Sequence, residues 1–450
     1  MKYKKQTLSA VILGIFLGVA VSMSVTVSAF KQDKTLLPLQ EIRKFNEVMA
    51  LIKSDYVEEV NEKQLITDAI RGMLSGLDPH SAYLDSEEFA ELQVDTSGKF
   101  GGLGIEVGME NGFVKVISPI DDTPAAKAGI KAGDLIIRLD EIQVKGKTLN
   151  EAVNIMRGNA GEPIVLTVVR EGEVAPIEIK IIRDIITVKS VKQRLLEANY
   201  GYLRISSFQA DTSSAAKQGL QTLEKTNNGK LKGLVLDLRN NPGGVLGAAV
   251  GVSDLFLKQG RIVNTEGRVA DSEMNYDATD FDLMEGKPII VLVNQGSASA
   301  SEIVSGALQD HDRALILGEK TFGKGSVQTV LPIDTTTAVK LTTARYFTPA
   351  GRSIQAKGII PDIEVEQREF ADKKQENSAF DAISEADLNG HLSNPEKDKK
   401  EKDKKEKDKK TDEKKDTVAK VDKSTEDDYQ LFEALNILKG MSLYQSNLSK

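Results

Sequence analysis

Residues 288–310 read PIIVLVNQGSASASEIVSGALQD, and this stretch decides the fold. Its first six residues form an apolar run of the kind that becomes a strand buried on both faces of a parallel sheet. A turn of small residues follows, and Ser299 stands at the start of a helix expected over 299–310. Working outward, we expect strands at 202–208, 233–238 and 314–317, and helices at 215–225 and in a segment ending at 257. Strands that alternate with helices over 200–365 predict a parallel α/β sheet.

The bulk composition bounds the domain count and the class of protein. A chain of 450 residues is expected to form two or three folded units. The net charge, 59 − 67 = −8, gives no sign of a nucleic-acid partner. The chain has no cysteine, which excludes disulfides and a thiolate nucleophile. Its three histidines, His80, His311 and His391, are too few for a histidine-rich metal centre, so we expect neither a metal nor a cofactor.

The first 30 residues have the pattern of a signal peptide or a membrane anchor. Lys2, Lys4 and Lys5 precede an almost continuous apolar run from Leu8 to Val27, and small residues end at Ala29. About 20 apolar residues can also span a bilayer, so a cleaved signal and an uncleaved anchor both remain open. Either way we expect an exported protein, periplasmic and held at the inner membrane if the segment is retained.

Residues 31–96 read mainly as helix, and the pattern then changes to strands and turns over 97–185. The loop Gly102, Leu103, Gly104 and Ile105 leads into the first of these strands, and a helix is expected over 149–156. This succession resembles a PDZ domain, a small β-barrel with helices. The resemblance implies that the backbone N–H groups of this loop bind a peptide's C-terminal carboxylate while the peptide adds as a strand.

The chain after residue 366 changes composition. Residues 367–425 are dominated by Lys, Asp and Glu, which cannot bury enough apolar area to fold, and this predicts a solvated linker. Residues 426–450 return to an amphipathic pattern that predicts a C-terminal helix, docked on this chain or on a partner protomer. An α/β core is left for 186–366.

Ser299 and Lys324 are the candidate catalytic pair. A serine hydroxyl needs a base and an oxyanion stabiliser before it can attack an amide. His311 would lie at the far end of the helix that Ser299 opens, and His391 borders the expected linker. The sequence does not exclude His80, but its turn context favours a structural role, and we therefore take lysine as the base. Lys324 lies between two glycines and near apolar side chains, and burial would favour its neutral amine. Gln328, on the same face of an extended segment, could orient that amine.

Two backbone N–H groups are needed for the oxyanion. Ala300 follows the nucleophile at a helix start and supplies one candidate. The turn at 240–244 supplies the other, and the sequence does not choose between Gly243 and Gly244.

The motifs around these residues resemble the carboxyl-terminal processing proteases, which are Ser/Lys-dyad peptidases with a PDZ domain. The matching stretches are SASASEI at 297–303, DLRNNPGG at 237–244 and TFGKGSVQ at 321–328. The resemblance implies a crotonase- or Clp-protease-like core with Ser299 as nucleophile, Lys324 as general base and Gln328 as the lysine-orienting residue. It also places the oxyanion hole at Ala300 and at the Gly243/Gly244 turn.

The same resemblance implies an endopeptidase that cuts proteins at or near accessible C-termini, with the PDZ domain sensing the substrate and gating the site. Arg157, just after the PDZ helix, is a candidate for relaying that state, and a surface charge is its alternative reading. A homo-oligomer is expected, and the need for an adaptor protein is left open. The competing function is a catalytically inactive PDZ scaffold or chaperone.

Overall fold

The computed structural model of the protein describes residues 38–120, 122–367, 384–392 and 428–448. The expected signal peptide or membrane anchor at residues 1–30 and most of the expected linker therefore lie outside the described residues. The chain divides after Met73 into two compact units, which are taken separately below. Among the described helices, none combines the length and the apolar character that crossing a bilayer requires.

The first unit consists of helix α2 (Leu39–Asp55) and most of helix α3 (Glu62–Ser75). This confirms that the N-terminal region is helical. Neither helix buries a residue, and apolar side chains such as Phe45 and Leu51 are about half exposed, at 47% and 59%.

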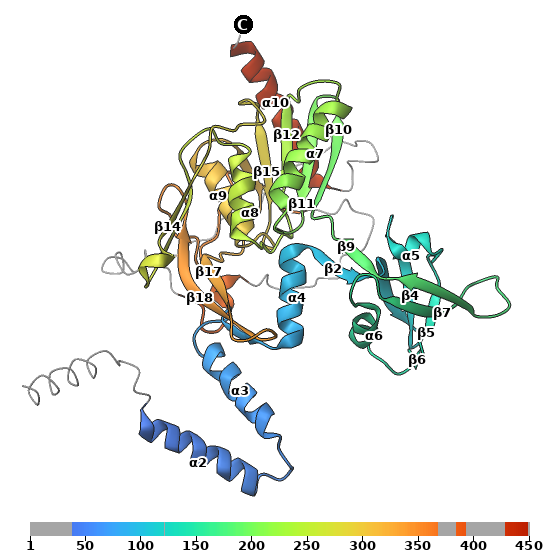
Figure 1. Ribbon diagram of the computed structural model, residues 1–450. Coiled ribbons are helices and arrows are strands. Elements are labelled where there is room, and N and C mark those ends of the chain that lie inside the picture. Colours follow the sequence, from blue (N-terminus) through green and yellow to red (C-terminus); the bar gives the residue numbers. More distant parts are fainter. Residues whose placement is uncertain (1–37, 121, 368–383, 393–427, 449–450) are drawn as a thin grey trace, which may run out of the picture. The chain divides into compact units, whose positions relative to one another are not determined.

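The second unit includes a small β-domain over residues 105–182 (Figure 1). Its antiparallel sheet has the order β3-β4-β5-β7-β8, with β6 paired to β5. The strands are β3 (Ile105–Glu110), β4 (Phe113–Pro119), β5 (Leu135–Leu139), β6 (Ile142–Gln143), β7 (Pro163–Val169) and β8 (Ile177–Ile182). Helices α5 (Pro124–Lys127) and α6 (Leu149–Met156) cover a core that includes Val116, Ile136 and Leu166. Strand β3 lies at one edge of this sheet.

Short elements flank this β-domain in sequence. Strand β1 (Ala82–Leu84) and helix α4 (Ser86–Ser97) precede it, and β2 (Lys99–Gly102) pairs with β9 (Asp184–Thr187) as a two-stranded ribbon. Asp85 caps α4, since its carboxylate accepts from the N–H groups of Glu87 and Glu88.

The expected α/β core is confirmed as a six-stranded sheet with the order β10-β11-β12-β15-β16-β19. The strands are β10 (Val191–Glu197), β11 (Tyr200–Ile205), β12 (Gly233–Asp237), β15 (Ile289–Val293), β16 (Leu315–Gly318) and β19 (Ile363–Glu364). All neighbours are parallel except β10 and β11, which form an antiparallel edge pair. Strands β12 and β15 are buried at every position, which explains their continuous apolar sequences.

Helices cover both faces of this sheet (Figure 1). One face packs against α7 (Thr212–Thr226), α8 (Leu246–Asp254) and α9 (Ala300–Asp310). The opposite face is covered by α10 (Tyr429–Leu448), whose Leu431, Ala434 and Leu438 pack with Val235 and Ile290 of the central strands. The C-terminal helix is thus part of the core of this chain.

A second, antiparallel sheet has the order β1-β18-β13-β14, with β17 also paired to β18. Its further strands are β13 (Arg261–Gly267), β14 (Met274–Asp277), β17 (Ser326–Pro332) and β18 (Ala338–Phe347), with a short 3-10 helix (Ala270–Ser272) between β13 and β14. Only the strand after residue 325 was expected from the sequence. Strand β1 joins this sheet through β18, so the segment before the β-domain contributes to the core.

Candidate active site

Three loops meet where adjacent parallel strands end. They follow β12, β15 and β16 and carry the Gly243/Gly244 turn, Ser299 and Lys324. Ligands and reacting groups commonly lie at this carboxyl edge of an open α/β sheet. The loops are also joined by hydrogen bonds, because Ser297 donates from its hydroxyl to the carbonyl of Leu238 at 2.8 Å and Phe322 donates from its N–H to the carbonyl of Ser297 at 3.1 Å.

Ser299 lies at a strained turn directly before α9. Its φ of +54° and ψ of −111° lie far from the regions that a residue with a side chain prefers. The side chain is half-buried. Strain of this kind at a strand-to-helix turn is typical of an exposed nucleophile.

The carboxylate of Glu302 fixes the backbone of both candidate catalytic residues. One oxygen accepts from the N–H groups of Ser299 at 2.8 Å and Lys324 at 2.9 Å. The other accepts from the hydroxyl of Thr321 at 2.5 Å and the N–H of Gly323 at 2.7 Å. Burial raises the pKa of Glu302 to about 7, although these four donors act to lower it. Glu302 is therefore the residue whose side chain joins the serine loop to the lysine loop.

Lys324 has the charge environment of a lysine that can lose its proton. Burial lowers the pKa of its ammonium group, and the positive charge of Lys340 acts in the same direction. The carboxylates of Glu385, Glu302 and Asp78 act in the opposite direction. Within the described residues, no hydrogen bond joins the Ser299 hydroxyl to the Lys324 amine, so the pair is not engaged in this conformation.

Tyr346 of β18 lies beside Lys324, and no motif in the sequence indicates this position. Its hydroxyl donates to the carbonyl of Lys324. Burial, followed by the negative charge of Glu302, raises the pKa of this phenol well above its usual value, while the Ser299 hydroxyl acts to lower it. The Tyr346 hydroxyl thus contacts the backbone of Lys324, and the Ser299 hydroxyl partly offsets the rise in its pKa.

The Gly243/Gly244 turn packs against Ser299. A Cβ on Gly243 would stand 2.8 Å from the Ser299 Cβ and 3.0 Å from the Ala300 nitrogen. The N–H of Gly243 donates to Asn241 Oδ1 at 2.9 Å. Across the described chain, no hydrogen bond uses the N–H of Ala300 or of Gly244, and these two donors remain uncommitted.

The Gln328 amide is hydrogen-bonded to hydroxyls of the second sheet in this conformation. This amide donates to the hydroxyls of Ser326 at 2.9 Å and Thr342 at 3.5 Å. The same-face argument from the sequence assumed a regular strand, but β17 begins only at Ser326 and its register shifts between Val327 and Gln328. A role for Gln328 in orienting Lys324 stays a prediction.

Comparisons with known proteins agree with this arrangement. Residues 199–365 match peptidase family S41, residues 101–181 match a PDZ domain, and residues 19–88 match the activating protease CtpB N-terminal domain. The carboxy-terminal-processing protease of Bartonella bacilliformis is 46% identical over 432 residues, which cover 95% of each chain. The chain belongs to the carboxy-terminal processing proteases of family S41.

Two further proteins show lower identity to this chain. The carboxy-terminal processing protease CtpA of Bacillus subtilis is 38% identical over 330 residues, covering 73% of this chain and 70% of the relative. Among solved structures, the photosystem II D1 C-terminal processing protease is 33% identical with a TM-score of 0.42, covering 72% of this chain and 86% of that one.

The PDZ loop of this family member is held in a single shape. The carbonyl of Leu103 accepts from the N–H of Ala125, and the carbonyl of Gly104 accepts from the N–H of Ile120. A Cβ on Gly104 would stand 2.3 Å from the Thr123 side chain, at a φ of +77° that favours glycine. In the described chain no hydrogen bond uses the N–H of Leu103 or Gly104. Gly102 ends β2 and Ile105 begins β3, the edge strand.

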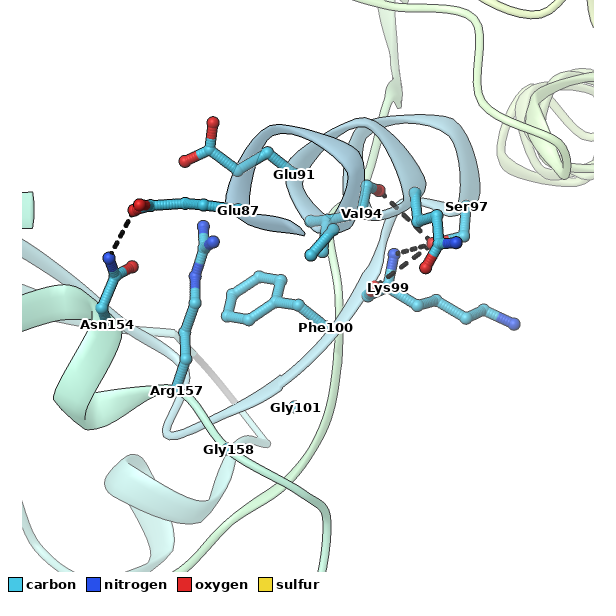
Figure 2. A pocket seen from close by; sticks show the side chains of 12 residues that line it. Glu87, Glu91, Val94, Ser97, Lys99, Phe100, Gly101, Asn154, Arg157 and Gly158 are labelled. Carbon is cyan, nitrogen blue, oxygen red and sulfur yellow. Dashed lines mark hydrogen bonds between the residues drawn. The ribbon is translucent and has the colours of Figure 1, made fainter. Parts of the chain in front are cut away.

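Arg157 lies at the end of α6 in a pocket of about 510 Å³ that α4 also lines. Figure 2 shows it beside Phe100, and its guanidinium carbon lies 5.3 Å from the centre of that ring. Its Nε is buried without a hydrogen-bond partner among the described residues. On the same pocket wall, Asn154 donates to Glu87 of α4 at 2.7 Å. A gating role for Arg157 stays a prediction.

Proposed function

We propose that this chain is an exported serine endopeptidase that cuts proteins at or near their C-termini with Ser299 as nucleophile and Lys324 as general base. The proposal rests on one observation above all: Glu302 joins the backbone of a strained serine to that of a half-buried lysine whose pKa is lowered. The family of the chain supports the protease activity. Its members' names support C-terminal processing.

The chemistry follows from the positions of these groups. The neutral amine of Lys324 takes the proton from the Ser299 hydroxyl as the oxygen attacks the scissile carbonyl carbon. The negative oxygen of the tetrahedral intermediate accepts hydrogen bonds from the N–H of Ala300 and from the Gly243/Gly244 turn. The lysine ammonium then protonates the leaving amine as the C–N bond breaks. Water, deprotonated by Lys324, then attacks the acyl-enzyme carbonyl. The ester C–O bond breaks, the lysine ammonium returns the proton to the Ser299 oxygen, and the product leaves with a new carboxylate.

The PDZ domain supplies the preference for chain ends. The unused N–H groups of Leu103 and Gly104 suit a terminal carboxylate, and β3 offers an edge along which a peptide can add as a strand. Arg157 lies where the PDZ helix α6 meets α4, and we propose that it transmits the occupied state of the domain.

The dyad is tested with β-casein as a loosely folded substrate. Ser299→Ala and Lys324→Ala are each expected to abolish its cleavage while circular dichroism shows an unchanged fold. Lys320→Ala is the matched control, because Lys320 is an exposed lysine four positions before Lys324. Full activity in Lys324→Ala would remove lysine as the base, and an uncut substrate with the wild-type protein would favour the scaffold alternative.

Export is tested separately by sequencing the N-terminus of the protein recovered from cells. Processing after Ala29 would show a cleaved signal peptide. An intact N-terminus in the membrane fraction would show an anchor, and an intact N-terminus in the cytosol would contradict export.

A further inference from the structure

A short segment from the region expected to be linker packs beside the catalytic lysine. Residues 384–392, here called the anchor segment, contain a 3-10 helix (Glu385–Asp387) that begins after Ser384. The carboxylate of Asp387 accepts from the N–H and hydroxyl of Ser384 and holds this turn. Glu385 is fully buried, although it belongs to a stretch rich in charge.

Each polar group that Glu385 brings into the interior is hydrogen-bonded. Its N–H donates to the carbonyl of Phe322 at 3.1 Å. Its carboxylate accepts from the Gln355 amide at 2.9 Å and contacts His80 Nε2 at 2.8 and 2.9 Å through its two oxygens. A buried carboxylate with this many partners is costly to disturb, because each lost contact leaves a polar group unsatisfied. The contacts therefore indicate a fixed part of the site.

These contacts hold the backbone on both sides of Lys324. Phe322, which Glu385 touches directly, lies two residues before the lysine. Gln355, itself fully buried, accepts from the N–H of Gly325 at 2.9 Å through the other end of its amide. Gly325 packs so tightly that a Cβ there would stand 2.5 Å from the Gln355 nitrogen. Glu385 thus braces the lysine loop before Lys324 through its backbone N–H, and after Lys324 through its carboxylate and Gln355.

We infer that Glu385, supported by His80 and Gln355, is a positioning residue for Lys324, and that the anchor segment is a working part of the active site. The inference rests on the proposed function of Lys324 as the base. It also gives a role to the Asp78-Pro-His80-Ser81 turn: the hydroxyl of Ser81 donates to Asp78 at 2.6 Å, and Asp78 accepts from the hydroxyl of Thr342 at 3.0 Å, which fixes the turn on β18.

The charge of Glu385 also acts on the lysine. It raises the pKa of the Lys324 ammonium group and so opposes the effect of burial. The ionisable groups around Lys324 are Glu302 of α9, Lys340 and Tyr346 of β18, Asp78 before β1 and Glu385, with His80 bound to Glu385 on its other side. Removing the charge of Glu385 alone should therefore make the lysine easier to deprotonate.

The test compares two substitutions of Glu385 with wild type and with Glu273→Gln, which removes one carboxylate from an exposed site at the end of the 3-10 helix before β14. The rate of β-casein cleavage is measured across pH, with kcat and KM separated. Glu385→Ala should lower kcat by about tenfold or more with KM nearly unchanged, since the base is displaced while substrate binding is not. Glu385→Gln, which keeps the side-chain size, should restore most of kcat and move the acidic limb of the profile to lower pH.

A second measurement does not depend on catalysis. In protein labelled with ¹³C at lysine Cε, the Lys324 signal, assigned by its absence in Lys324→Ala, is titrated by NMR. Its midpoint should be lower in Glu385→Gln than in wild type and unchanged in Glu273→Gln.

The inference is overturned if Glu385→Ala keeps the wild-type kcat, or if kcat falls only in proportion to the folded fraction seen by circular dichroism. It is also overturned if the Lys324 midpoints of Glu385→Gln and Glu273→Gln coincide. Failure of the proposed function shows itself differently, as a wild-type protein that leaves casein uncut, and the NMR titration then still decides whether Glu385 acts on Lys324.

Discussion

At the scale of single residues, Gly243 sets how closely the Gly243/Gly244 turn approaches Ser299. Its φ of +102° and the 2.8 Å approach of a Cβ to both Ser299 Cβ and the carbonyl oxygen of Ala298 leave no room for a side chain. Gly243→Ala is therefore expected to abolish casein cleavage and to lower the melting temperature. Gly247→Ala is the control, because Gly247 lies exposed in α8 with nothing within 4 Å of its Cβ position.

The two alanine variants separate a local clash from a general effect of adding a methyl group. We expect Gly247→Ala to keep activity and to leave stability unchanged or slightly higher, since alanine favours a helix. An active Gly243→Ala protein would show that the turn can move away from Ser299 at little cost.

Glu302 makes stability depend on pH. Its pKa in the folded protein is about 7, above the ordinary value of 4.5. The folded state therefore binds the carboxyl proton of Glu302 more tightly than the unfolded state does. The stabilisation that this proton provides is fully present below pH 4.5 and is lost as pH rises through about 7. The unfolding free energy of wild type minus that of Glu302→Gln should therefore fall by about 3 kcal/mol as pH rises over that range.

This prediction is measured by urea unfolding of both proteins from pH 4 to 8. Titrating groups that do not interact with Glu302 cancel in the difference. Glu302→Gln is expected to be less stable at every pH because its amide nitrogen faces N–H donors. A difference that does not change with pH would mean that Glu302 titrates normally in the folded chain.

Of the residues around Ser299 and Lys324, Glu302 can be identified from the sequence, whereas Tyr346 and Glu385 cannot. Ser299 and Glu302 stand three positions apart at a helix start, a spacing typical of a capping box. Tyr346 and Glu385 carry no such signal, because they approach the site from segments whose placement is set only by tertiary packing.

At the scale of elements, α10 completes the hydrophobic core on one face of the central sheet. Leu438 is fully buried, and a Cβ on Gly233 would stand 2.7 Å from its Cγ. Leu438→Ala should destabilise the protein by about 2–5 kcal/mol, as expected for an emptied core position. Leu443 of the same helix is 65% exposed, and Leu443→Ala should change stability by less than about 0.5 kcal/mol.

Thermal and urea unfolding of the two variants measure this difference. Equal, small effects would mean that α10 is not docked on its own chain in solution. A parallel fall in stability for both would instead point to loss of the helix itself.

The elements differ in how well the sequence predicts them. The strands β12 and β15 were predicted because full burial makes every residue apolar. Strands β13 and β18 mix polar and apolar residues on a partly exposed sheet, and no such run marks them. The shift in register between Val327 and Gln328 was equally invisible, and the face assigned to Gln328 depended on it.

At the scale of the whole molecule, the PDZ domain should link the substrate's end to its cleavage. The uncommitted N–H groups of Leu103 and Gly104 would bind a carboxylate far better than a neutral amide. A peptide substrate with an amidated C-terminus is therefore expected to show a KM raised by about tenfold relative to the same peptide with a free carboxylate.

The measurement compares the two peptides on wild type and on Ser299→Ala, where binding is followed by fluorescence anisotropy without turnover. Equal KM and equal affinity for the two peptides would contradict carboxylate recognition. A higher KM and a lower affinity for the amidated peptide would support carboxylate recognition.

The order of the large units along the chain can be predicted from the sequence, whereas the long-range contacts that hold them together cannot. The contact between His80 and Glu385 spans 305 positions, and that between Arg239 and Asp428 spans 189. No local pattern encodes contacts of this range, so the sequence predicts a linker at the anchor segment and does not choose a docking site for α10.

The docking of α10 has a consequence for the way the chain reaches its native state. Arg239, in the loop after β12, is bound by the carboxylates of Asp237 and Asp428. Until Asp428 and the helix behind it have been synthesised, β12 and β15 present one bare apolar face, and closing so long a loop is slow. A newly made chain should therefore pass through an aggregation-prone stage that ends only when α10 arrives. Assembly of the core in this protease is a late event in its own biosynthesis.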